Sequence, residues 1–205
     1  MTRANTQSRI ERVPAVAQAL RHGTRSAHRR LDHHPLLQQL VRPGLTRASY
    51  TASLLALYRP QAQLEAVVAA SAACLGLAIG EAAPAPPRLP QLEADLHGLG
   101  AVLPLPGSSE CQVADSPAAL VGLRYVLDGS RLGGQVIARQ VVEWLGDDVP
   151  HRFFAAADPD WHWRRFLAFG QHFCPPEDVD RAVAAAQAAF ANYLVSLDAA
   201  EDFEP

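Results

Sequence analysis

The decisive stretch of this sequence is Gly129-Ser130-Arg131-Leu132-Gly133-Gly134-Gln135, because it places three glycines inside a segment, residues 121–144, that otherwise has the apolar spacing of one long helix. Each glycine in a helix interior costs up to ~1 kcal/mol relative to alanine, so another interaction must offset the three. Gly129 and Gly133 are four residues apart, share one helical face and leave its backbone bare. Two interpretations fit this face: close packing of another helix, or the approach of a flat or bulky ligand.

The rest of the chain predicts one all-α domain. Its 205 residues, 49% of them hydrophobic, are enough for one compact core. Apolar residues recur at helical spacing in several segments, and no segment shows the alternation typical of a strand. We expect residues 1–12 to be disordered, residues 13–200 to form the domain, and residues 201–205 to be a tail.

Helix-start signals position the predicted helices. Pro14 and Pro117 suit the first turn of a helix, and Thr46 and Ser116 suit the capping position before one. Pro60 is expected to bend the long helix in which it lies, and the proline-rich segment 76–90 to be a surface connection. The helices that we expect cover residues 14–31, 36–41, 47–75, 91–99, 117–146, 159–173 and 177–198.

Composition narrows the classes of partner. The formal net charge of −3 gives no global attraction to nucleic acid or to an anionic membrane. All 18 basic residues are arginines, so guanidinium groups, histidines or backbone N–H groups must hold any anionic ligand. The three cysteines show no CxxC spacing, and residues 1–13 lack the apolar core of a signal peptide. We therefore expect a soluble, cytoplasmic protein that binds neither nucleic acid nor membrane.

One histidine has neighbours that suit a metal ligand. None of the eight histidines lies in an HExxH or Glu-x-x-His pattern, and the sequence has no Gly-x-Ser-x-Gly elbow or Walker-type loop. His28 is followed one helical turn later by Asp32 and preceded by Thr24 and Arg21, one and two turns earlier. A carboxylate four residues on can orient the second nitrogen of a ligating imidazole. A partly buried or capping histidine is the alternative that these residues leave open.

Two motifs together resemble the haem oxygenase family, in particular the soluble bacterial branch encoded beside bacteriophytochromes. The first is Leu20-Arg21-(x2)-Thr24-(x3)-His28-(x2)-Leu31-Asp32, and the second is Tyr125-Val126-Leu127-Asp128-Gly129-Ser130-Arg131-Leu132-Gly133-Gly134-Gln135-Val136-Ile137. The resemblance extends over residues 16–198. It implies a single-domain helical bundle that holds haem between a proximal helix and a kinked distal helix.

The resemblance assigns roles to particular residues. It implies that His28 is the proximal ligand of the haem iron and that Asp32 orients its imidazole. It implies catalytic roles for Gly129, Ser130 and Gly133 on the distal helix. Further haem-binding residues implied by the resemblance are Arg21, Thr24, Arg124, Tyr125, Arg164 and Phe190. Core packing remains the alternative for Phe190 and for Phe166, and an ordinary exposed position remains the alternative for Arg164.

The reaction and its partners also follow from the resemblance. Haem b would serve as both cofactor and substrate, and dioxygen and electrons would convert it to biliverdin, iron and carbon monoxide. A ferredoxin or a flavoprotein reductase would supply the electrons, and a bacteriophytochrome is a candidate acceptor of the biliverdin. Two other functions stay open: a haem-binding carrier or sensor of the same fold, and a related helical enzyme of the thiaminase-like or di-iron group.

One position departs from the mammalian members of the family. They carry an aspartate directly after the first distal glycine, where this chain has Ser130. A hydroxyl both donates and accepts hydrogen bonds, so we expect Ser130 to hold a water chain with more help from the backbone of Gly129 and Gly133. Asp128 is a candidate substitute, although one residue earlier it points about 100° away on the helix.

Overall fold

The computed structural model describes residues 14–104, 112–155 and 157–201, and within these ranges the chain forms helices and no strands. The all-α prediction is confirmed. The predicted disordered segment 1–12 and residues 202–205 of the predicted tail lie outside the described residues. The α-helices are α1 (Ala15–Gly23), α2 (Arg25–Asp32), α3 (Pro35–Gln38), α4 (Arg47–Cys74), α5 (Leu89–Gly98), α6 (Pro117–Leu145), α7 (Pro159–Phe173) and α8 (Val179–Glu201), with short 3-10 helices η1 (Gln39–Val41), η2 (Gly80–Ala82) and η3 (Pro176–Asp178).

The two longest helices begin where the sequence predicts. The Ser116 hydroxyl accepts a hydrogen bond from the Ala119 backbone N–H, which satisfies one of the free donors at the start of α6. Thr46 and Ser49 form a reciprocal capping box at the start of α4. α6 ends at Leu145, and Gly146 follows with φ +89°, a backbone angle that glycine adopts without strain.

The prediction of one helix over residues 14–31 is wrong, because the segment forms two helices that meet at Thr24. The Thr24 hydroxyl donates a hydrogen bond to the Leu20 carbonyl at 2.7 Å. Beside it, a Cβ added to Gly23 would lie 2.5 Å from Val183 Cγ1, so the chain passes close to α8 at the junction. Tertiary contact with α8 therefore accompanies a break that local helical spacing does not reveal.

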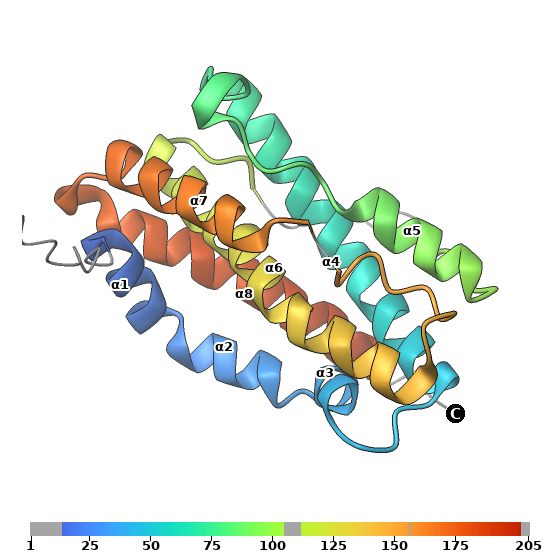
Figure 1. Cartoon of the computed structure of the whole chain (residues 1–205). Helices are drawn as coiled ribbons and strands as arrows, with labels where there is room; N and C mark the ends of the chain where they lie inside the picture. The colour runs from blue at the N-terminus through green and yellow to red at the C-terminus, as the bar shows by residue number, and fades with distance from the viewer. Residues whose placement is uncertain (1–13, 105–111, 156, 202–205) are drawn as a thin grey trace, which may run out of the picture.

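α6 and α8 pack along each other through the middle of the molecule, and α7 lies along α6 (Figure 1). At Gly122 of α6 an added Cβ would lie 2.0 Å from the backbone oxygen of Ala182 in α8. No side chain fits in that space, so this glycine permits the close approach of the two helices.

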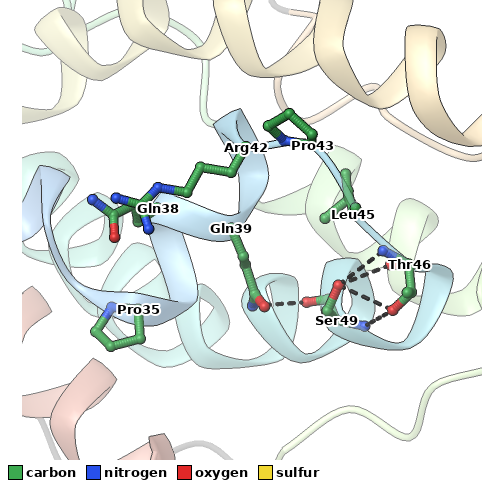
Figure 2. Close-up of a pocket in the computed structure, with 9 residues that line it drawn as sticks. Pro35, Gln38, Gln39, Arg42, Pro43, Leu45, Thr46 and Ser49 are labelled. Carbon is green, nitrogen blue, oxygen red and sulfur yellow. Dashed lines mark hydrogen bonds between the residues drawn. The ribbon is translucent and has the colours of Figure 1, made fainter.

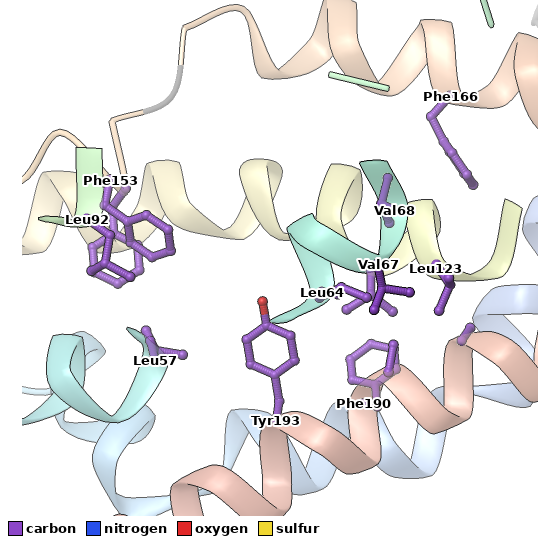
Figure 3. Close-up of a cluster of buried hydrophobic side chains, with 14 of the residues drawn as sticks. Leu57, Leu64, Val67, Val68, Leu92, Leu123, Phe153, Phe166, Phe190 and Tyr193 are labelled. Carbon is purple, nitrogen blue, oxygen red and sulfur yellow. The ribbon is translucent and has the colours of Figure 1, made fainter. Parts of the chain in front are cut away.

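The core is formed between α4, α6, α7 and α8. Figure 3 shows Leu64 and Val67 of α4 with Leu123 of α6, and Phe190 of α8 below them. Phe166 of α7 is 1% exposed and belongs to the same cluster of buried side chains. This core packs against several sides of α6. The side of α6 that does not face the core is therefore available for binding a ligand.

Candidate functional site

The glycines of α6 fall into two groups. A Cβ added to Gly134 would lie 3.0 Å from the Phe154 backbone oxygen, so Gly134 serves close packing, as Gly122 does. A Cβ added to Gly129 would meet only Trp163 Cζ3, at an ordinary 3.6 Å, and one added to Gly133 would meet no atom of the described residues within 4 Å. The packing interpretation therefore explains Gly122 and Gly134, and it does not explain the pair Gly129 and Gly133.

We call the surface of α6 at Gly129 and Gly133 the glycine face. Aromatic rings border it. The ring centroids of Tyr125 and Trp163 are 6.0 Å apart, and Trp163 stacks on Phe166 at 4.9 Å. Tyr125 and Trp163 are only partly buried, so part of their ring surface faces outward. A flat apolar ligand on the glycine face would meet these rings.

His28 of α2 has the partner that the sequence predicts. Its Nδ1 lies 2.8 Å from Asp32 Oδ2, and both side chains are 56% exposed. Because Asp32 engages Nδ1, Nε2 is the ring nitrogen left for a metal. The imidazole also contacts Phe190 of α8, with ring centroids 5.8 Å apart. The structure thus brings together three of the predicted site residues: His28, Asp32 and Phe190.

Arg124 is engaged inside the protein. Its Nε lies 3.4 Å from Asp128 Oδ2, its Nη1 donates to the Ala82 carbonyl at 2.8 Å, and its guanidinium lies 4.0 Å from the Phe169 ring centroid. Burial lowers the pKa of Arg124, and the Asp128 carboxylate opposes that shift. The geometry gives this guanidinium three partners and leaves it little freedom to hold a propionate.

Asp128 is also unsuited to the role of a substitute carboxylate on the distal face. It is 2% exposed and forms ion pairs with Arg124 and, at 3.9 Å, with Arg131. Burial raises the pKa of Asp128, while the two arginines act in the opposite direction. A carboxylate that is buried between two arginines is not available to order water on the glycine face, which argues against Asp128 as the substitute.

The remaining predicted residues differ in accessibility. Arg21 and Arg164 are exposed, whereas Thr24 is buried and its hydroxyl is used by the Leu20 carbonyl. Ser130 is exposed at the edge of the glycine face and receives a hydrogen bond from Arg88.

Arg88 is a residue beside the glycine face that the sequence does not predict. This residue lies in the segment predicted as a surface connection, yet it is only 4% exposed. The prediction is wrong at this point because Arg88 precedes α5 and points inward toward α6, 42 residues further on. The only local clue is its place directly before the helix that begins at Leu89.

Two cavities lie elsewhere. Figure 2 shows the first, about 380 Å³ in volume, at the turn between α3 and α4, where Gln38, Arg42 and Thr46 contribute to its polar wall. The second, about 290 Å³, lies between α4, the proline-rich connection and the Arg124 side of α6. Neither is lined by His28 or by the glycine face. Among the described residues, no group of three or more His, Cys, Asp or Glu side chains could hold a metal ion.

Known proteins with the same fold define the class. The chain superposes on the NO- and CO-bound haem oxygenase of Neisseria meningitidis with a TM-score of 0.69 and 23% identity, covering 92% of this chain and 93% of that one. It superposes on haem oxygenase from Leptospira interrogans with a TM-score of 0.72 and 17% identity, covering 91% and 100%. For the haem complex of haem oxygenase-1 from the cyanobacterium Synechocystis the TM-score is 0.65 at 18% identity, covering 91% and 92%. The fold is therefore that of the haem oxygenases.

Sequence similarity takes the assignment from the fold to the family. A haem oxygenase of Xanthomonas campestris pv. campestris is 39% identical over 120 residues, which cover 55% of this chain and 68% of that protein. No family model matches the sequence. The chain belongs to the haem oxygenase family, so the predicted family is confirmed. Membership of the phytochrome-associated branch stays a prediction. Within the described residues, no helix combines the length and the apolar character required to cross a membrane.

Proposed function

We propose that this protein is a haem oxygenase that converts haem to biliverdin, iron and carbon monoxide with dioxygen and electrons. The observation that carries the proposal is the glycine face of α6 in a member of this family: Gly129 meets only the Trp163 ring, at an ordinary distance, and Gly133 meets no described atom within 4 Å. Two glycines that destabilise a helix and are not needed for packing are explained by a ligand that requires bare backbone.

The residues present fit a haem group. His28 offers an exposed imidazole whose Nδ1 is held by Asp32, which leaves Nε2 for iron. Phe190 contacts that imidazole, and Tyr125 provides aromatic surface beside the glycine face. The sequence has no Cys-x-x-Cys-His pattern for covalent attachment, which supports haem b. When bound, the haem iron supplies the chemistry that activates dioxygen.

The protein's own contribution is positioning. Asp32 accepts the Nδ1 proton of His28 and fixes the tautomer and the orientation of the ring. Gly129 and Gly133 leave room for a small ligand beside the helix backbone, and the Ser130 hydroxyl provides a polar group at the edge of that room. The Trp163 ring borders this face, because a Cβ added to Gly129 would lie 3.6 Å from its Cζ3 atom.

We assign the propionate-binding role to exposed arginines. Arg21 and Arg164 are free of the buried ion pairs that engage Arg124, so they can hold carboxylates without breaking an interior contact. Thr24 contributes to the shape of the α1–α2 junction, since its hydroxyl is already used within the chain.

The partners remain those that the resemblance implies. A ferredoxin or a flavoprotein reductase is the proposed electron donor, the cytoplasm is the proposed location, and a bacteriophytochrome is the proposed acceptor of biliverdin. A role in iron acquisition is compatible with the same chemistry.

A single-turnover assay tests the proposal. The haem-loaded protein is mixed with dioxygen and ascorbate or reduced ferredoxin, and absorption is followed at the haem Soret band and at the biliverdin bands. We expect loss of the Soret band with formation of biliverdin and carbon monoxide. Tight haem binding without loss of the Soret band would favour a carrier or sensor. A protein that binds no haem would favour the thiaminase-like or di-iron alternative.

A further inference from the structure

A buried arginine reaches the exposed edge of the glycine face. Arg88 Nη2 donates a hydrogen bond of 2.5 Å to Ser130 Oγ, although Arg88 itself is 4% exposed. Its guanidinium also lies 4.8 Å from the centroid of the Phe153 ring. A charged group is costly to bury, so a specific interaction has to hold it in this place.

A buried polar chain fixes the backbone from which Arg88 extends. The Glu65 carboxylate of α4 accepts hydrogen bonds from the backbone N–H groups of Arg88 at 2.6 Å and Leu89 at 3.0 Å, at the start of α5. Gln61 donates to the same carboxylate at 2.6 Å and accepts from the Tyr193 hydroxyl at 2.6 Å. Because these contacts use the backbone of Arg88, they persist when its side chain is changed.

The hydrogen-bonding capacity of Ser130 is largely used by this arrangement. A hydroxyl has one donor and two acceptor sites. Ser130 Oγ donates to the Leu127 carbonyl at 2.8 Å and accepts from Arg88. One acceptor site remains, so Ser130 can receive a hydrogen bond on its exposed side but cannot give one. In this respect it matches a carboxylate, which only accepts.

The charge beside the hydroxyl is opposite to that of a carboxylate. Burial lowers the pKa of Arg88 to about 10, with Arg131 acting in the same direction and Tyr193, Glu65 and Asp128 opposing it. Arg88 therefore stays protonated near neutral pH. The edge of the glycine face thus combines an acceptor oxygen with an adjacent fixed cation.

We propose that Arg88 is a positioning residue that fixes Ser130 as a hydrogen-bond acceptor and places a positive charge at the edge of the glycine face. The significance of Arg88 for oxygen chemistry rests on the proposed function. The contact between Arg88 and Ser130 is independent of that function. A donor such as water would point an O–H group at Ser130, and an anion on this face would be favoured by Arg88.

The pKa of a thiol introduced by Ser130→Cys is sensitive to the positive charge of Arg88, and it can be measured in the haem-free protein. The variant is made in a Cys74→Ser, Cys111→Ser background, and Cys174 remains because it is buried and burial raises the pKa of its thiol. The rate of alkylation against pH gives the pKa of the introduced thiol. We expect it about one unit or more below an ordinary thiol, since an adjacent guanidinium stabilises the thiolate.

Controls separate the effect of Arg88 from that of the helix. Val136→Cys in the same background puts a thiol at an exposed position on the same helix, and we expect an ordinary pKa there. Combining Ser130→Cys with Arg88→Met should restore an ordinary pKa, and Arg88→Lys should retain part of the shift. Equal thiol pKa values at positions 130 and 136, or no response to Arg88→Met, would overturn the proposal. The comparison of the two thiols needs no change at Arg88, so it holds even where Arg88→Met does not fold.

A second readout uses the ferric haem-loaded protein and azide as the anion. We expect Arg88→Met to weaken azide binding several-fold and Arg88→Lys to restore part of it, with the haem ligated in all three proteins. Unchanged azide binding would count against a cation that acts on the bound ligand. Failure of the parent chain to turn over haem would contradict the proposed function and leave the thiol result standing, so the two failures are distinguishable.

Discussion

The two helices that carry the predicted site, α2 and α6, are held in the molecule in different ways. None of the residues of α2 is buried, and its contacts are made by partly buried residues such as Ala27 and Leu31. α6 buries residues along most of its length and packs against α4, α7 and α8. α6 is therefore a firmly packed side of the candidate site. α2 is a surface helix, and the fold does not depend on its predicted iron ligand, His28.

This difference separates ligand binding from stability. A change at an exposed residue of α2 removes few packed contacts, so its effect on folding should be small. A change that adds atoms at a packed position of α6 forces apart two helices of the core. Substitution of the ligand on α2 should therefore change the haem spectrum and leave thermal unfolding almost unchanged. Substitution of a packed glycine on α6 should chiefly change thermal unfolding.

The largest expected effect is that of His28→Ala on haem ligation. The histidine-ligated spectrum of the ferric protein should be lost, because Nε2 of His28 is the proposed iron ligand. The melting temperature of the haem-free protein should stay close to that of the parent, since the side chain is 56% exposed. Absorption spectra and thermal unfolding measure the two effects. An unchanged haem spectrum would show that another residue ligates the iron.

Gly122→Ala should show the opposite profile. The added Cβ would lie 2.0 Å from the Ala182 backbone oxygen, so α6 and α8 must separate and the protein should lose about 3 kcal/mol of unfolding free energy. Gly133→Ala is the matched control. It meets no described atom within 4 Å and should stabilise the haem-free protein by up to about 1 kcal/mol while weakening haem binding.

Denaturant unfolding of the haem-free variants measures both changes. Similar losses of stability for Gly122→Ala and Gly133→Ala would contradict the division of the α6 glycines into packed and open positions.

The glycine pair shows how much of this architecture the sequence predicts. Helix starts at Ser116 and Thr46 follow from local hydrogen bonding, and the structure confirms both. The four-residue spacing puts Gly129 and Gly133 on one face, but only the packed structure shows that Gly134 touches another segment and Gly133 does not.

Long-range contacts account for what the sequence does not predict. The resemblance predicts that Arg124 binds haem, and the structure instead pairs it with Asp128 one turn later and with the Ala82 carbonyl, 42 residues away. Arg88 reaches Ser130 over the same separation from a segment rich in prolines. No local periodicity encodes such contacts, because they depend on how α4, α5 and α6 are arranged.

Asp32→Asn should produce a smaller effect than either of the preceding changes. The amide still occupies the position of the carboxylate but lacks the charge that favours and orients the ligating form of His28, so haem affinity should fall by about 10- to 100-fold. Stability should change little, because Asp32 is 56% exposed. Transfer of haem to an acceptor protein measures the affinity.

Asp147→Asn is the matched control for Asp32→Asn. It removes the same charge from an exposed position just beyond α6. Equal effects of the two substitutions on haem affinity would mean that Asp32 acts only through overall charge and not through His28.

The smallest expected effect is a dependence of the free energy of unfolding on pH. It comes from His162 of α7, which lies near Arg131 of α6. Burial lowers the pKa of His162, and the positive charges of Arg131 and Arg165 act in the same direction, while Asp158 opposes them. The folded protein therefore binds this proton less readily than the unfolded chain, so stability is lost as the pH falls through the ordinary histidine range near about 6.5. His162→Gln should lose less stability than the parent between about pH 7.5 and about pH 5, as measured by urea unfolding. Parallel curves for the two proteins would mean that neither burial nor the charges of Arg131 and Arg165 lower the pKa of His162 in the folded protein.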